Sequence, residues 1–134
     1  MYTGSCLCRK VKFQISGTID SIIFCHCSQC RKAQGSAFGA NGFVNQKDFK
    51  FVSGESYLSA YESSPGKVRC FCKTCGSPII SKRDSDPEKL RVRLGTLDTD
   101  ILERPTGHIF VSDKVNWFEV NDDLPKYERY ESSR

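Results

Sequence analysis

The stretch Cys72-Lys73-Thr74-Cys75-Gly76 has the spacing of a zinc knuckle, and it decides how this chain is expected to fold. The two-residue spacer turns the backbone so that both thiolates face one metal ion, and Gly76 permits a positive φ after the second ligand. A second pair, Cys6 and Cys8, stands at the entrance to a predicted strand. Residues i and i+2 of a strand share a face and lie about 6.6 Å apart, so their sulfurs can converge on one ion. Together the two pairs predict a closed Cys₄ zinc site of the structural kind.

A second cluster offers three thiolates by spacing, which is one ligand short of a closed shell. Its members are Cys25, Cys27 and Cys30. Three protein ligands with an exchangeable fourth position are the arrangement of a catalytic zinc. The alternative is a second structural site, closed by His26 or by Cys70. In an extended segment His26 points away from its neighbouring cysteines, whereas Cys70 would face a metal if residues 68–72 form a strand. Both alternatives remain open at this point, with the three-ligand site favoured.

The composition is that of one small globular domain over residues 1–134. With 38% hydrophobic and 27% charged residues the chain can bury a modest core. No run of about 18 apolar residues predicts a membrane span. The first ten residues lack the apolar region of a secretory signal, so we expect a cytoplasmic protein. In that compartment clustered cysteines bind metal more often than they form disulfides, and cysteines one residue apart cannot pair without strain.

Short strands separated by turn signals dominate the chain. Alternating or apolar runs predict strands over Val11–Ile15, Phe49–Val52, Leu90–Leu94, His108–Val111 and Trp117–Val120. One short helix is predicted over Ser28–Gln34, with Ser28 as N-cap and Gly35 as terminator. We expect Trp117 and Phe118 to pack in the core. A solvated acidic tail is predicted from Glu119, Asp122, Asp123, Glu128 and Glu131. The fold class predicted is mainly β.

Three cysteine segments and a C-terminal signature carry a resemblance to a known family. They are Gly4-Ser5-Cys6-Leu7-Cys8, Cys25-His26-Cys27-Ser28-Gln29-Cys30-Arg31-Lys32, Arg69-Cys70-Phe71-Cys72-Lys73-Thr74-Cys75-Gly76-Ser77-Pro78, and His108–Lys114 with Trp117-Phe118-Glu119. Over about residues 3–120 the chain resembles the glutathione-dependent formaldehyde-activating enzymes, a family that includes the centromere protein V-like proteins. The resemblance implies a β-tent-like fold of short antiparallel strands organised around zinc. It departs from the family pattern at Arg9, where a glycine usually follows the first cysteine pair.

The resemblance also implies a cofactor and a reaction class. It assigns a structural zinc to Cys6, Cys8, Cys72 and Cys75, and a catalytic zinc to Cys25, Cys27 and Cys30. The implied activity is that of a carbon–sulfur lyase acting on a small thiol adduct such as S-hydroxymethylglutathione, the adduct of glutathione and formaldehyde. Because that thiol is anionic, Arg31 and Lys32 are candidate contacts for its carboxylates. Balancing the thiolate charge, or lying at the solvated surface, is an equally weighted interpretation of these two cations.

A second class of function is a zinc-stabilised binding module for glutathione, a protein or nucleic acid, without turnover. Nucleic acid is the least favoured of these partners. Counting seven cysteines as thiolates and adding two Zn²⁺ lowers the formal charge from +4 to about +1, which is too little for nonspecific binding to nucleic acid. An exchangeable ligand at the second zinc favours an enzyme, and a fourth cysteine favours a module. The sequence gives no indication of oligomeric state.

Overall fold

The computed structural model describes residues 1–132, which form ten short strands and one α-helix. The strands are β1 Tyr2–Ser5, β2 Lys12–Ile15, β3 Ser21–Cys25, β4 Gly39–Asn45, β5 Phe49–Ser53, β6 Leu58–Ser64, β7 Lys67–Cys72, β8 Pro78–Arg83, β9 Lys89–Arg93 and β10 Gly107–Ile109. The helix α1 spans Ser28–Gln34. Short 3₁₀ turns lie at Gln46–Asp48, Glu55–Tyr57, Leu94–Thr96 and Val111–Asp113. Within residues 1–132, no helix has the length and apolar character needed to cross a membrane.

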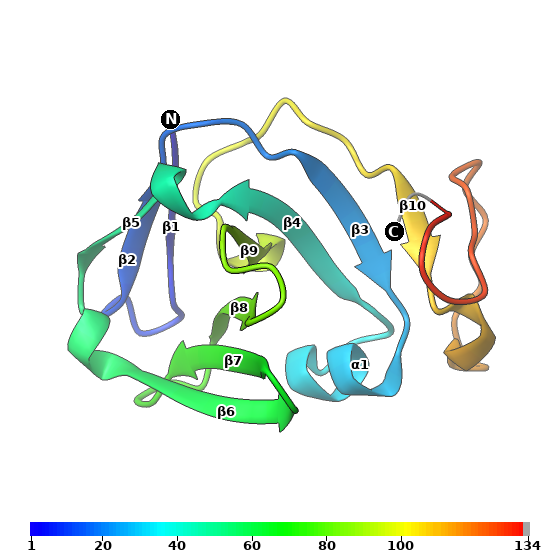
Figure 1. Ribbon diagram of the computed structural model, residues 1–134, viewed down its shortest axis with the longest axis horizontal. Helices are drawn as coiled ribbons and strands as arrows, with labels where there is room; N and C mark the ends of the chain where they lie inside the picture. Colours follow the sequence, from blue (N-terminus) through cyan, green and yellow to red (C-terminus); the bar gives the residue numbers. More distant parts are fainter. Residues whose placement is uncertain (133–134) are drawn as a thin grey trace.

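The strands form two sheets of unequal size. The smaller sheet has the order β1-β2-β5, and the larger has the order β10-β3-β4-β9-β8-β7-β6. Neighbouring strands are antiparallel except β10, which pairs in parallel with β3. In Figure 1 the larger sheet follows a C-shaped course from β10 and β3 through β4 and β9 to β7 and β6. The smaller sheet lies on its outer side, and α1 lies near the open end of the C.

The core forms where the smaller sheet packs against the larger one. Phe13 and Ile15 of β2 are buried with Ile80 of β8 and Val92 of β9. The Phe13 ring needs a glycine opposite it, because a Cβ on Gly4 would lie 2.2 Å from its Cζ atom. Burying side chains of this size contributes about 1.5–3 kcal/mol each, so this cluster supplies much of the stability of a small domain.

Strand β9 alternates as the sequence predicts, but neither of its faces is solvated. Leu90 and Val92 enter the core, with exposed fractions of 3% and 0%. Arg91 and Arg93 point to the other face and are also buried, at 5% and 3%. An alternating pattern normally indicates one apolar and one wet face. Here the charged face turns toward the inside of the curved sheet, which makes it part of the site described below.

The other predicted strands are found with two differences. Strands occur within or across four of the five predicted ranges, and β10 is shorter than expected at three residues. The strand predicted over Trp117–Val120 is wrong. The Lys114 ammonium donates hydrogen bonds to the carbonyls of Val115 and Phe118, which closes a turn there. Trp117 is therefore 69% exposed rather than in the core, whereas the Phe118 ring packs against Phe38.

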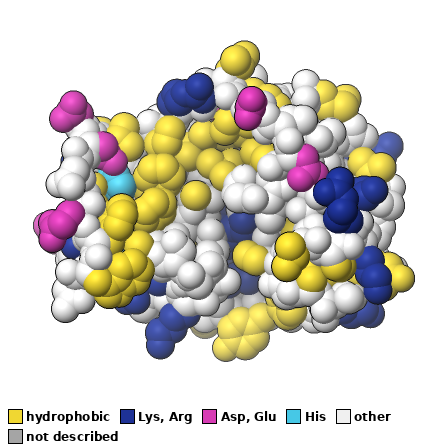
Figure 2. Space-filling view, turned by 180° about the vertical axis from the view of Figure 1, so that it is seen from behind, with side chains coloured by type: hydrophobic (Ala, Val, Ile, Leu, Met, Phe, Trp, Pro, Cys, Tyr) yellow, Lys and Arg dark blue, Asp and Glu magenta, His cyan; other side chains and the backbone are white. Residues whose placement is uncertain are grey.

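The acidic segment near the C-terminus is attached to the domain along its backbone. Tyr127 and His108 pair through their backbone, and Phe110 N–H donates to the Arg129 carbonyl. Acidic side chains lie on this edge of the molecule, at the left of Figure 2. Most of these acids are exposed as predicted, but Asp122 accepts a hydrogen bond from His108. The segment is thus a bound strap over β10 with a solvated outer surface.

Candidate metal centres

The first cysteine cluster joins the β1–β2 loop to the turn after β7. The Sγ atoms of Cys6, Cys8, Cys72 and Cys75 all lie within 4.8 Å of one another. The Sγ–Sγ distance is 3.6 Å for Cys6–Cys8 and 3.8 Å for Cys8–Cys72. Four sulfurs placed tetrahedrally around zinc at about 2.3 Å would be about 3.8 Å apart. The donor type, the number of sulfurs and these two distances therefore suit a tetrahedral Zn²⁺.

Backbone conformation on both sides of this cluster sets the direction of the thiols. Gly76 has φ 80°, and its N–H donates to the Cys72 carbonyl at 2.7 Å, as the zinc-knuckle spacing predicts. On the other side Arg9 has φ 68°. The turn of Arg9 is closed by its N–H donating to the Cys6 carbonyl at 3.0 Å. The chain thus adopts at Arg9 the left-handed conformation that a glycine would adopt without strain, so the departure in sequence leaves the turn in place.

The second cluster lies where β3 passes into α1. Cys25 ends β3, Cys27 precedes the helix and Cys30 is in its first turn. Their three Sγ atoms lie within 4.8 Å of one another. The predicted helix N-cap is wrong by one residue. Cys27 is the N-cap, and its sulfur accepts the Cys30 N–H at 3.4 Å. A capping side chain must accept from an N–H two or three residues on, and the Cys27 sulfur does so here in place of the Ser28 hydroxyl.

Neither of the residues considered as a fourth ligand belongs to the three-cysteine cluster. Cys70 is buried in the core, where burial raises the pKa of its thiol. His26 is completely buried, and its Nε2 lies 2.8 Å from Nδ1 of His108. Among the described residues the second cluster therefore has three donors. Such a set fits a metal ion that keeps one position for an outside ligand.

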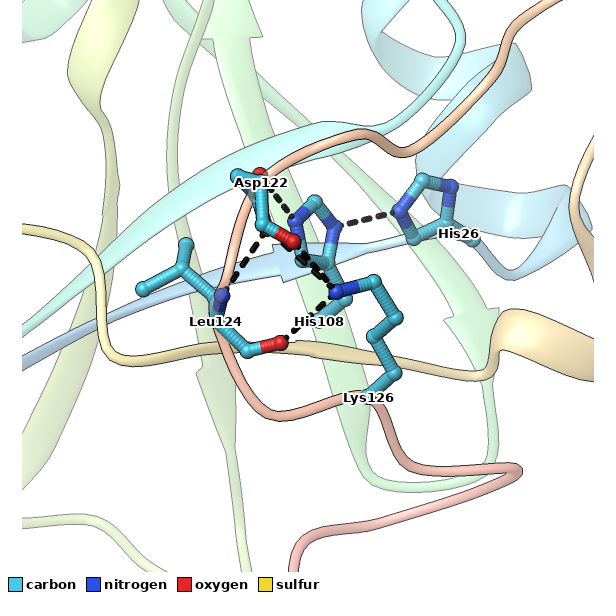
Figure 3. A network of polar contacts seen from close by, with 5 residues as sticks. All are labelled: His26, His108, Asp122, Leu124 and Lys126. Atoms are coloured by element: carbon cyan, nitrogen blue, oxygen red, sulfur yellow. Dashed lines mark hydrogen bonds and ion pairs between the residues drawn. The ribbon is translucent and has the colours of Figure 1, made fainter.

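A chain of polar contacts runs from His26 to the C-terminal segment (Figure 3). His108 Nε2 lies 2.9 Å from a carboxylate oxygen of Asp122, and His108 Nδ1 faces His26. The carboxylate accepts the N–H of His108, so the bare Nδ1 accepts from His26. Burial, followed by the influence of His108, lowers the pKa of His26 to about 4, which keeps it neutral at pH 7. The contact of His26 with His108 thus fixes the backbone between Cys25 and Cys27.

Buried basic side chains surround Cys30. Both terminal nitrogens of Arg69 approach its Sγ, at 3.8 and 3.9 Å, and the Asn41 amide approaches at 3.8 Å. Arg93 donates to Asn41 Oδ1 at 2.8 Å, which fixes that amide. The pKa of Cys30 is held well below its usual value by hydrogen bonds from Cys25 and Cys27, and also by the charges of Arg69 and Arg93. Neither Arg69 nor Arg93 was among the residues predicted for the site. The alternation of charged residues in β7 and β9 was the available signal.

A cavity of about 250 Å³ opens beside the second cluster, and all three of its cysteines line the wall. Neither of the predicted carboxylate contacts is among the lining residues. The Arg31 guanidinium turns back to donate from Nε to the His26 carbonyl at 3.3 Å. Lys32 lies exposed on the outer face of α1. Basic side chains from β7, β8 and β9 line the cavity instead: Lys67, Arg83 and Arg91.

A mainly β domain with one cluster of four thiols and one of three defines a class of cysteine-rich domain whose clusters have donor sets that suit a metal ion. Within that class, the chain belongs to the glutathione-dependent formaldehyde-activating enzyme family, which it matches over residues 1–113.

The chain is also similar to two individual proteins. It is 31% identical over 78 residues to a protein of Schizosaccharomyces pombe described as an uncharacterised lyase; the match covers 58% of this chain and 55% of that relative. The chain thus matches about half the length of that relative. A crystal structure of a Rhodobacter sphaeroides protein is similar at 26% identity with a TM-score of 0.63. That similarity covers 73% of this chain and 89% of the other.

Proposed function

We propose that this protein is a zinc-dependent carbon–sulfur lyase that interconverts S-hydroxymethylglutathione with glutathione and formaldehyde. The observation that carries the proposal is the second cluster, in which three thiols face one another at the wall of a cavity. A bound zinc ion would act there as a Lewis acid that stabilises the sulfur of the thiol adduct. Cys25, Cys27 and Cys30 would hold that ion, and the remaining position would face the cavity. The first cluster would hold a structural zinc.

Residues of the chain orient the cysteine cluster and shape the cavity in which this reaction would take place. Cleavage breaks the bond between sulfur and the hydroxymethyl carbon, and the hydroxyl proton is transferred to sulfur through solvent, giving thiol and formaldehyde. Arg69 and Asn41 donate toward Cys30, and the Arg69 guanidinium balances part of the charge of the thiolate cluster. Ile23, Phe43 and Ile109 give the cavity apolar walls that restrict water around the reacting bond.

The test compares formaldehyde release from S-hydroxymethylglutathione by three zinc-loaded proteins. The wild type and Cys70→Ser are expected to accelerate release above the spontaneous rate, because Cys70 lies outside both clusters. Cys27→Ser should remain folded, lose the second zinc and return to the spontaneous rate. Exchange between free and glutathione-bound formaldehyde, followed by NMR, measures both directions at once. A zinc-loaded wild type that binds glutathione but exchanges at the spontaneous rate would instead identify a binding module.

A further inference from the structure

The inner face of the larger sheet carries five basic residues on three adjacent strands. They are Lys67 and Arg69 on β7, Arg83 on β8, and Arg91 and Arg93 on β9. The register makes them neighbours, because Lys67 pairs with Arg83 and Ser81 pairs with both Arg69 and Arg91. Like charges placed directly opposite each other destabilise a sheet. We therefore expect a negatively charged group to bind close to these basic side chains.

The cavity wall provides no carboxylate to balance Lys67 and Arg83. None of the described lining residues is Asp or Glu. Within residues 1–132 neither Lys67 nor Arg83 forms an ion pair. Arg83 Nε is buried without a hydrogen-bond partner, although the end of the same side chain donates to the Tyr130 hydroxyl at 3.4 Å. Lys67 and Arg83 are half-buried, and a cation that loses part of its hydration without a carboxylate partner carries a desolvation cost that an anionic ligand would offset.

Four of the five cations divide into two groups with different surroundings, and the fifth, Arg91, lies over the Phe43 ring at 4.9 Å. Arg69 contacts the Cys30 thiol, and Arg93 holds the amide that also contacts it, so these two serve the cysteine cluster. Lys67 and Arg83 line the cavity itself, at the far ends of β7 and β8 from the Cys72 cluster. The cavity therefore has thiols on one side and a cationic pair on another.

We infer that Lys67 and Arg83 bind a carboxylate of the ligand whose sulfur reaches the second cluster, so that the site selects anionic thiols over neutral ones. This inference rests on the proposed function, since it takes the ligand to be a small thiol. A guanidinium binds a carboxylate through two parallel hydrogen bonds, and an adjacent ammonium adds a third charge-assisted bond. The cationic pair thus sets which thiol enters, and the cysteine cluster acts on its sulfur.

Binding to the zinc-loaded protein tests this inference without turnover. The ligands are glutathione and glutathione diethyl ester, which keeps the thiol and amide groups but lacks both carboxylates. Titration calorimetry should give at least tenfold weaker binding of the diester to the wild type. Lys67→Met and Arg83→Gln should each weaken glutathione binding about tenfold and leave diester binding unchanged. Lys82→Met is the matched control, because Lys82 is an exposed lysine beside Arg83 on β8 that does not line the cavity.

Unchanged diester affinity in the variants also shows that they are folded. The inference is overturned if the wild type binds both ligands equally or binds neither. It is equally overturned if Lys67→Met and Arg83→Gln lose both ligands to the same extent. Failure of the lyase proposal has a different signature, namely charge-selective binding of glutathione with exchange at the spontaneous rate. Conversely, equal acceleration with glutathione and its diester would leave the lyase standing and remove the role of the cationic pair.

Discussion

His26 and His108 lie 82 positions apart in the chain, and their rings meet with Nε2 of the first 2.8 Å from Nδ1 of the second. The contact is buried, and Asp122 fixes its far end. Because His26 stands between Cys25 and Cys27, this pair connects the C-terminal segment to the backbone of the second cluster. The position of two candidate metal ligands thus depends on a residue in a distant strand.

Replacing His108 should therefore disturb both stability and the second cluster. His108→Ala leaves the buried His26 Nε2–H without an acceptor and opens a cavity beside Phe24 and Phe38, whose rings contact His108. We expect a loss of about 2–4 kcal/mol in the free energy of unfolding. Asp122→Asn is the control, with an expected loss below about 1 kcal/mol, because its side chain is exposed and can still accept. Urea unfolding of the zinc-loaded proteins measures both; equal losses would contradict the hydrogen-bond chain.

The two clusters should respond differently to loss of one ligand. Zinc analysis of carefully prepared wild type is expected to give two ions per chain. Cys72→Ser should abolish soluble folded protein, because the first cluster joins segments 64 positions apart and metal binding contributes folding free energy. Cys27→Ser should give a folded domain with one zinc. Circular dichroism and elemental analysis together decide this, and equal loss of folding in both variants would make both sites structural.

Arg9 offers a test of backbone strain beside the first cluster. Its φ of 68° costs about 1–2 kcal/mol for a residue with a Cβ. Arg9→Gly relieves that strain but adds freedom to the unfolded chain, so the net expected gain is up to about 1 kcal/mol. Arg9→Ala removes the same charge and keeps the Cβ, so it should gain nothing. Thermal unfolding of the zinc-loaded proteins compares them. A gain from alanine equal to that from glycine would show that charge, not conformation, is responsible.

Lys67 gives the stability a predictable dependence on pH. Burial, followed by the charge of Arg69, lowers the pKa of Lys67 from 10.5 to about 8, although the Cys30 thiolate acts in the opposite direction and Arg83 and Arg93 reinforce the lowering. Between these pH values the unfolded chain binds more protons than the folded chain, so the free energy of unfolding rises with pH. Lys67→Met should remove this rise and add about 1–2 kcal/mol at pH 7 in the absence of thiol. Since cysteines titrate in the same range, the measurement is the difference between wild type and variant across pH 7–10. A constant difference would contradict the effect.

The sequence predicts the local features of this molecule well. Cysteine spacing anticipates both clusters, and the turn signals anticipate the left-handed conformations of Gly35 and Gly76. Alternation in β9 correctly predicts a strand but not that its arginines are buried, because a period of two gives two faces without saying what covers each. The prediction that Trp117 lies in a strand and packs in the core is wrong for a related reason. Its apolar run resembles a strand. However, the Lys114 ammonium donates hydrogen bonds to backbone carbonyls that would otherwise accept from a partner strand.

The candidate site is predicted only as far as neighbours in sequence define it. Cys25, Cys27 and Cys30 are close in the chain, so their meeting follows from spacing. The contact of Arg69 with Cys30 depends on the order of strands in the larger sheet, and local patterns do not contain that order. Arg31 and Lys32 are predicted as contacts because they follow Cys30 directly in the sequence. On a helix, however, consecutive residues point in different directions, and these two point away from the cavity.

The order of the two clusters along the chain has a consequence for how the protein is made. Cys30 and Cys75 are 45 positions apart, so a ribosome adding ~5–20 residues per second needs about 2–9 s to pass from one to the other. During that interval the three-cysteine cluster is already complete on the nascent chain, while Cys6 and Cys8 still wait for their partners. Metal supply during synthesis therefore reaches the three-cysteine cluster first, and a shortage would leave reduced thiols exposed to oxidants before the fold can close around them.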